Sequence, residues 1–223
     1  MGDVIDMAGR RRQRGAVAER LDHRLPSTAA TFFFDLASPE TYLAAERVTR
    51  GFAEVRWVPV LGDAVGDGCR DDEELQQRAE CRATELRMPL VWPEQMPVSF
   101  LSAMRVADYA CDAGRGEPFV LAACRLAFCG GFDLDDPDIL AEAAAAAGLP
   151  LDDCLRAAGD RGRDGALIER GRRLTAQGAQ LLPAVRVRRT LFCGEDRLLE
   201  AAAAARVTGP ARSLARPDSP TAG

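Results

Sequence analysis

The feature that most constrains the fold is a strand–helix–strand pattern near the N-terminus. Segment 31–36 (TFFFDL) is a short apolar and aromatic run, which predicts a buried strand. Segment 38–50 has a helical pattern that begins with Ser-Pro and ends just before Gly51, and these residue types favour a helix start and a helix end. The alternating segment 54–61 (EVRWVPVL) predicts a second strand. Two strands joined in this way are expected to pair in parallel through a right-handed crossover.

The rest of the chain consists of a helical block and a second segment with strands. From about residue 71 to 180 the apolar periodicity is helical, strand patterns return at 182–187 and 190–194, and 195–207 is helical again. Because the two strand-containing halves can bury their faces only by joining, we predict an α/β thioredoxin-like fold: a four-stranded mixed sheet with a large all-helical insertion. The predicted parts are a tail at 1–29, the first half of the fold at 30–64, the insertion at 65–178, the second half at 179–206 and a disordered tail at 207–223.

Composition limits the class of function. The 223 residues carry a net charge of -5, which provides no general basic surface for nucleic acid, and 47% hydrophobic residues suffice for a core. No apolar run approaches the ~20 residues that a membrane-spanning helix needs. The arginine cluster near the N-terminus is not followed by the apolar stretch of a secretory signal. We therefore expect a cytoplasmic protein that binds a small molecule, with no nucleic acid or membrane partner.

Residue types that are rare or missing narrow the chemistry. The chain has no lysine and no asparagine, so all 29 basic residues are arginine, and its single histidine is His23. A histidine-based metal site, a Ser–His triad and a Cys–His pair are therefore disfavoured, and we expect no metal. Cys-x-x-Cys spacing is also missing, which disfavours a dithiol redox site. The seven cysteines are Cys69, Cys81, Cys111, Cys124, Cys129, Cys154 and Cys193.

Four segments, taken in order, resemble one known family. They are FFFDLASPETYLAAERV, LRMPLVWPEQMPVSFLSAMRVADYA, LAFCGGFDLDDPDIL and LLPAVRVRRTLFCGEDRLLE. Together they are similar to the DsbA-like thioredoxin-fold proteins, and within these to the branch of 2-hydroxychromene-2-carboxylate isomerases and kappa-class glutathione transferases. The resemblance runs from about Thr31 to Ala205, which is most of the chain.

The resemblance implies roles for residues around the start of the first helix. In the oxidoreductase branch a Cys-Pro-x-Cys opens this helix, and here Ser-Pro-Glu-Thr stands in its place. In the isomerase and transferase branch, a serine at the position of Ser38 faces the sulfur of bound glutathione. Pro183 matches the family's cis-proline, and Leu182 matches the residue whose backbone pairs with the glutathione peptide. Asp196, in Gly-Glu-Asp-Arg, matches the aspartate that binds the γ-glutamyl ammonium group.

These correspondences imply an enzyme that uses glutathione or another low-molecular-weight thiol for isomerisation or conjugation of a small unsaturated aromatic acid. Ser38 and the helix N-terminus would stabilise the thiolate, which would add to a conjugated alkene and leave again. The helical block would supply the apolar substrate pocket through Trp92, Met96 and Phe100. Relatives are often dimers, so the resemblance also allows a homodimer.

Other interpretations of the same residues remain open. Ser38 could be only a helix cap, because Ser-Pro-Glu-Thr is a good helix start by itself. The chain could be a degenerate relative of disulfide oxidoreductases that lacks the dithiol and binds without turnover, or Cys193 could take part in thiol exchange. Glu40 argues against the enzyme hypothesis, because its negative charge in the first helical turn would oppose a neighbouring thiolate. An apolar cleft beside the start of the helix would favour the enzyme, and Glu40 filling that space would favour the binding protein.

Overall fold

The computed structural model describes residues 30–65, 72–93 and 100–207. The predicted N-terminal tail, the predicted C-terminal tail after Val207, and Met96 lie outside these ranges. Among the described helices, none is both long and apolar enough to cross a membrane.

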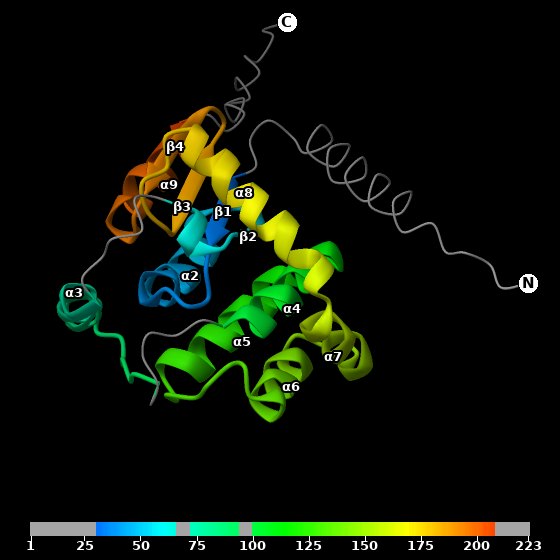
Figure 1. Ribbon diagram of the computed structural model, residues 1–223. Coiled ribbons are helices and arrows are strands. Elements are labelled where there is room, and N and C mark those ends of the chain that lie inside the picture. Colours follow the sequence, from blue (N-terminus) through cyan, green and yellow to red (C-terminus); the bar gives the residue numbers. More distant parts are fainter. Residues whose placement is uncertain (1–29, 66–71, 94–99, 208–223) are drawn as a thin grey trace, which may run out of the picture.

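A four-stranded mixed sheet with the strand order β2-β1-β3-β4 forms the centre of the fold (Figure 1). β1 (Ala30–Phe34) pairs in parallel with β2 (Val55–Pro59) and antiparallel with β3 (Ala184–Val187). β3 pairs antiparallel with β4 (Thr190–Cys193) through a tight turn in which Arg188 takes a φ of 56°. The predicted four-stranded mixed sheet and the parallel pairing of its first two strands are both confirmed.

Helices cover both faces of the sheet. Phe32 and Phe34 of β1 belong to a core shared with α2 (Pro39–Gly51) and α9 (Leu198–Val207), which pack on one face. Phe33, which points the other way, belongs to a smaller core that includes Leu174 of α8 (Asp164–Ala176). This alternation follows from the two-residue period of a strand and places α8 on the opposite face from α2.

The helical block between β2 and α8 packs beside the sheet (Figure 1). α4 contacts β2, α5 and α7, while α5 also contacts α2 and α6, so the block and the sheet share one core. Its helices are α3 (Asp72–Leu86), α4 (Leu101–Asp112), α5 (Gly116–Phe128), α6 (Pro137–Ala146) and α7 (Leu151–Gly159).

α8 approaches the short 3-10 turn η1 (Gly62–Ala64) after β2 very closely, and a glycine makes this approach feasible. A Cβ atom added at Gly171 would lie 2.5 Å from the Ala64 Cβ and 3.2 Å from the Val60 side chain. Since α8 also adjoins the 3-10 turn η2 (Arg161–Arg163) at its other end, it links the helical block to the sheet.

The helix boundaries follow capping chemistry, with small differences from the sequence predictions. Asp136 is the N-cap of α6 and accepts a hydrogen bond from the Asp138 N–H at 2.8 Å. The predicted single helix over 195–207 instead begins with the 3-10 turn η3 (Glu195–Arg197) before α9. A tight 3-10 turn of this kind is frequent at helix termini.

Helix α4 is capped by a residue that is distant in the sequence. Asp135 Oδ1 accepts hydrogen bonds from the Ser102 N–H at 2.9 Å and the Ala103 N–H at 3.3 Å, two donors that α4 itself cannot satisfy. We expect Asp135→Ala to lower the free energy of unfolding by about 0.5–2 kcal/mol, the usual effect of losing a cap. Urea unfolding measures this, with the exposed Glu142→Ala as control at about 0.5 kcal/mol or less. Equal effects of the two substitutions would contradict the capping role.

Candidate active site at the start of helix α2

Helix α2 begins at the turn that follows β1. Ser38 is its N-cap, with an extended backbone, and the Ser38 Oγ accepts a hydrogen bond from the Thr41 N–H at 3.4 Å. Pro39 occupies the first turn, where the N–H that it lacks would have no partner. The predicted helix start is confirmed. The helix end supplies N–H groups and the positive end of the helix dipole at this point.

The hydroxyl proton of Ser38 is already engaged within the protein. The Ser38 Oγ donates to Glu40 Oε2 at 2.9 Å, and Glu40 Oε1 pairs with Arg78 of α3 at 2.9 Å. The Glu40 carboxylate therefore holds the hydroxyl proton of Ser38, and Arg78 offsets the charge of that carboxylate. A thiolate would have to displace the Glu40 carboxylate before Ser38 could donate to it.

The cis-proline segment, which is the second part of the predicted site, lies just before β3 at the end of the sheet where β1 ends. The Leu182–Pro183 peptide bond is cis, as predicted, and the Pro183 C=O accepts a hydrogen bond from the Gly194 N–H at 2.8 Å. The antiparallel register of β1 and β3 ends at the pair Phe33–Ala184, so Leu182 lies just beyond it, at the end of the sheet where the chain leaves β1 for α2. Within the described ranges, neither the N–H nor the C=O of Leu182 forms a hydrogen bond. Its backbone therefore has no hydrogen-bond partner among the described residues at this end of the sheet.

The Gly-Glu-Asp-Arg segment places one acid in the interior and one at the surface. Asp196 is exposed, and its Oδ1 lies 2.5 Å from the position that a Cβ on Gly194 would take. Glu195 is buried and forms ion pairs with Arg47 of α2 and with Arg82 of α3, the latter at 2.7 Å. Glu195 therefore joins η3 to two helices, whereas Asp196 remains accessible to a ligand.

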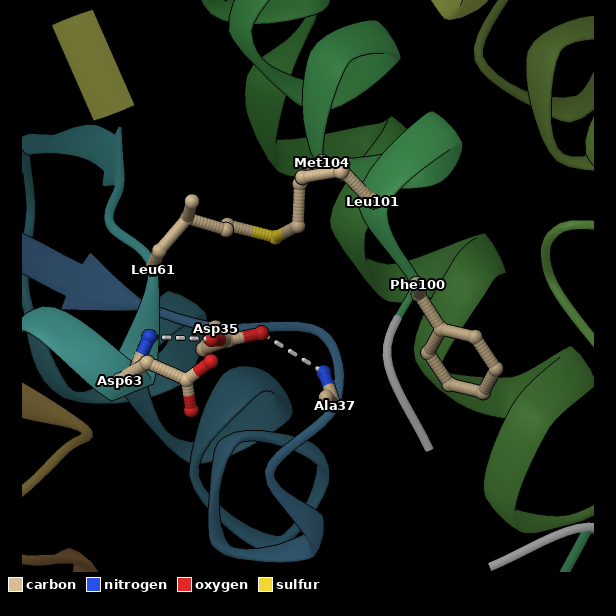
Figure 2. A pocket seen from close by; sticks show the side chains of 8 residues that line it. Asp35, Ala37, Leu61, Asp63, Phe100, Leu101 and Met104 are labelled. Carbon is tan, nitrogen blue, oxygen red and sulfur yellow. Dashed lines mark hydrogen bonds between the residues drawn. The ribbon is translucent and has the colours of Figure 1, made fainter. Parts of the chain in front are cut away.

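A small hollow of about 60 Å³ lies between the turns after β1 and β2 and the start of α4; we name it the α2–α4 hollow. Figure 2 shows Asp35 and Asp63 on one side and Met104 and Phe100 on the other. Met104 is fixed there by a contact between its Sδ and the Leu36 N–H at 3.3 Å. The hollow thus lies between the thioredoxin-like half and the helical block.

The predicted substrate-pocket residues are separated in the structure. Phe100 lines the α2–α4 hollow and is buried. Trp92 instead packs edge-on against Phe128, with ring centroids 6.3 Å apart, and its Nε1 donates to Glu80 Oε1 at 2.8 Å. Met96 falls outside the described residues.

Sequence reasoning missed Asp35, the acid at the floor of the hollow. Its Oδ1 accepts a hydrogen bond from the Ala37 N–H at 2.9 Å, and its Oδ2 accepts one from the Gly62 N–H at 2.5 Å. Burial raises the pKa of Asp35 to about 6, and the nearby Asp63 adds to the effect, although the two N–H donors oppose it. An aspartate directly after a buried aromatic strand was the available sequence signal.

None of the cysteines that the structure describes lines the α2–α4 hollow. Cys193 packs with the core on the α8 face of the sheet, whereas α2 lies on the other face. Cys129 lies 3.1 Å from the Tyr42 hydroxyl, which also donates to the Pro89 C=O at 2.6 Å. Among the described residues, no three His, Cys, Asp or Glu side chains gather in a way that could hold a metal ion.

Comparison with known proteins identifies the fold. No protein-family model and no curated protein matches the sequence. The structure is similar to that of a 2-hydroxychromene-2-carboxylate isomerase, with a TM-score of 0.68 and 16% identity over 79% of this chain and 93% of the other. It is also similar to a probable DsbA oxidoreductase from Streptomyces coelicolor, with a TM-score of 0.64 and 18% identity over 81% of this chain and 90% of the other. The chain therefore has the DsbA-like thioredoxin fold that its sequence predicted, with the large helical insertion.

Proposed function

We propose that this protein is an enzyme of the DsbA-like family that uses glutathione or another low-molecular-weight thiol to isomerise or conjugate a small unsaturated aromatic acid. The observation that carries the proposal is the backbone of Leu182. It forms no hydrogen bond within the described residues and lies just beyond the β1–β3 register, at the end of the sheet where the chain continues into α2. An extended thiol peptide could pair with this backbone as an added strand pairs with a sheet edge. The side chain of the exposed Asp196 lies next to Gly194, and the Gly194 N–H donates a hydrogen bond to the Pro183 C=O. The Asp196 carboxylate is suited to binding an ammonium group.

The start of α2 could supply the energy needed to hold a thiolate. Lowering the pKa of a thiol by two units requires about 2.7 kcal/mol. The helix dipole contributes about 0.3–1 kcal/mol, and a hydroxyl hydrogen bond to a charged acceptor contributes about 1.5–3 kcal/mol. These two contributions together reach the required amount only if Ser38 donates to sulfur and no longer to Glu40.

The α2–α4 hollow limits what part of a substrate can enter. A water molecule needs about 10–15 Å³ of such space, so about 60 Å³ admits a few atoms, such as one carbonyl or carboxylate group. The apolar walls from Phe100 and Met104 suit the adjoining unsaturated carbon atoms. The hollow would therefore bind the reacting end of the acid and leave its aromatic part outside.

Calorimetric titration with glutathione at neutral pH tests the proposal. Ser38→Ala should raise the dissociation constant by about tenfold or more, because a charge-assisted hydrogen bond is lost. Glu40→Gln should lower it by about two- to fivefold, because a negative charge leaves the helix N-terminus. Glu46→Gln, in the middle of the same helix, is the matched control and should change little. The absence of binding heat with glutathione and with a second thiol, N-acetylcysteine, would rule out the cofactor site.

A non-catalytic binding protein is the second candidate, and one observation favours it. The Ser38 hydroxyl is bonded to Glu40, which is itself paired with Arg78, so the start of α2 is internally satisfied. If Glu40→Gln leaves the protein unable to bind any thiol, this second candidate is the better account.

A further inference from the structure

We propose that Asp35 is the acid–base residue of the α2–α4 hollow, which gives a proton to the substrate when the thiolate adds and takes it back when the thiolate leaves. This role rests on the proposed function, because it needs a thiolate and an unsaturated acid. It extends that function by naming a protein group for the proton transfer, which Ser38 cannot perform while its hydroxyl serves the sulfur.

The geometry holds the carboxyl group in place and exposes it to the hollow. Each oxygen of Asp35 accepts one backbone N–H, from Ala37 at the start of α2 and from Gly62 after β2. The residue is 8% exposed and lines the hollow together with Leu61 and Met104. Figure 2 shows its carboxylate held between Ala37 and the turn that carries Asp63. Each oxygen keeps a further lone pair for a ligand.

The charges around Asp35 favour a proton on it. η1 contributes Asp63, a second acid that also lines the hollow. α4 contributes only the uncharged Phe100, Leu101 and Met104, and the start of α2 contributes Ala37. Among the described residues, no arginine forms an ion pair with Asp35. Burial without a cation raises its pKa to about 6, so both the acid and the carboxylate are available near neutral pH.

The proton transfer balances the reaction. When the thiolate forms a carbon–sulfur bond at the β-carbon, the alkene electron pair moves onto the carbonyl group and gives an enolate. The Asp35 carboxylic acid protonates this enolate and becomes a carboxylate. For isomerisation, rotation about the new single bond follows; the carboxylate then removes the proton and the carbon–sulfur bond breaks, which regenerates thiolate and acid. For conjugation, the product keeps the proton and water reprotonates Asp35.

The first test needs no substitution. Carbon-13 NMR of the side-chain carboxyl groups, followed from pH 4 to 8 on the wild-type protein, should show that Asp35 titrates with a midpoint near 6. A midpoint below about 4.5 would overturn the proposal, because the group would then carry no proton at working pH.

The second test measures glutathione addition to 4-phenylbut-3-en-2-one, an unsaturated ketone used as probe. Asp35→Asn should reduce kcat by about 100-fold or more, the usual contribution of an acid–base residue, and should remove the inflection near pH 6 from the pH profile. Asp135→Asn is the matched control, because Asp135 also accepts two backbone N–H groups but does not line the hollow. It should keep kcat and the inflection.

The outcomes separate the two proposals. If the wild type accelerates the addition and Asp35→Asn does so equally well with the same pH profile, the role of Asp35 is wrong and the proposed function stands. If the wild type binds no thiol and gives no acceleration, the proposed function fails and the role of Asp35 fails with it.

Discussion

Phe32→Ala should lower the free energy of unfolding by about 3–5 kcal/mol, the range for removing a fully buried phenylalanine. Phe32 lies on the central strand β1 with no solvent exposure, and its ring meets Trp57 edge-on at a centroid distance of 4.9 Å. It also stacks at 6.0 Å on Phe34, which precedes the turn to α2. The substitution leaves a cavity between the sheet and α2 that these neighbours fill only partly. Urea unfolding followed by circular dichroism measures the loss.

Phe132→Ala is the matched control, because the same side chain is removed from a site that is 47% exposed. The expected loss is about 1 kcal/mol or less, since little apolar area is taken from a packed environment. If the two substitutions destabilise the protein equally, the assignment of Phe32 to the main core is incorrect.

Asp108→Ala should lower the free energy of unfolding by about 3–5 kcal/mol, because it leaves two partly buried arginines without the buried carboxylate that pairs with both. Asp108 on α4 is 4% exposed and forms ion pairs with Arg163 at 2.5 Å and with Arg170 at 2.6 Å. Arg170 also donates to the Pro59 C=O at the end of β2. This carboxylate therefore ties the helical block to α8 and to the sheet, and its loss affects all three. Thermal and urea unfolding both report the change.

Asp112→Ala provides the comparison for this ion network. Asp112 lies on the same helix and pairs with the same Arg163, at 3.2 Å, but its side chain is 67% exposed. An exposed pair of this kind contributes about 0–1 kcal/mol. A loss for Asp108→Ala no larger than that for Asp112→Ala would mean that the buried network does not hold α4 against α8.

The sheet and most helices could be predicted because their signals are local. Successive side chains of β1 point alternately into the two cores on either face of the sheet. Ser38 with Pro39 marks the start of α2, and Asp136 with Pro137 marks the start of α6. Each signal depends on residues a few positions apart, which is the range over which capping and periodicity act. The order of the elements then leaves few ways to bury all the apolar faces.

The details of the site depend on contacts between distant residues, and the sequence does not reveal these. Asp35 meets the Gly62 N–H only because β1 and β2 end side by side. Glu40 is neutralised by Arg78 from α3, which the pattern predicts as a helix but does not place. Trp92 was expected to line the substrate pocket because of its place in the family motif. In the structure its indole N–H instead donates a hydrogen bond to Glu80. Hydrogen bonding between side chains that lie 12 to 59 residues apart is set by packing and not by local pattern.

The most direct test of the central claim is NMR mapping of glutathione binding on nitrogen-15-labelled protein. If the start of α2 and the unpaired backbone of Leu182 form a thiol-peptide site, saturable amide shifts should concentrate at Ser38, Thr41 and Leu182, with smaller shifts near Asp196. Helices α6 and α7, which are remote from this end of the sheet, should remain unchanged. Absence of saturable shifts, or shifts confined to the helical block, would contradict the proposal that this fold holds a thiol cofactor at the start of α2.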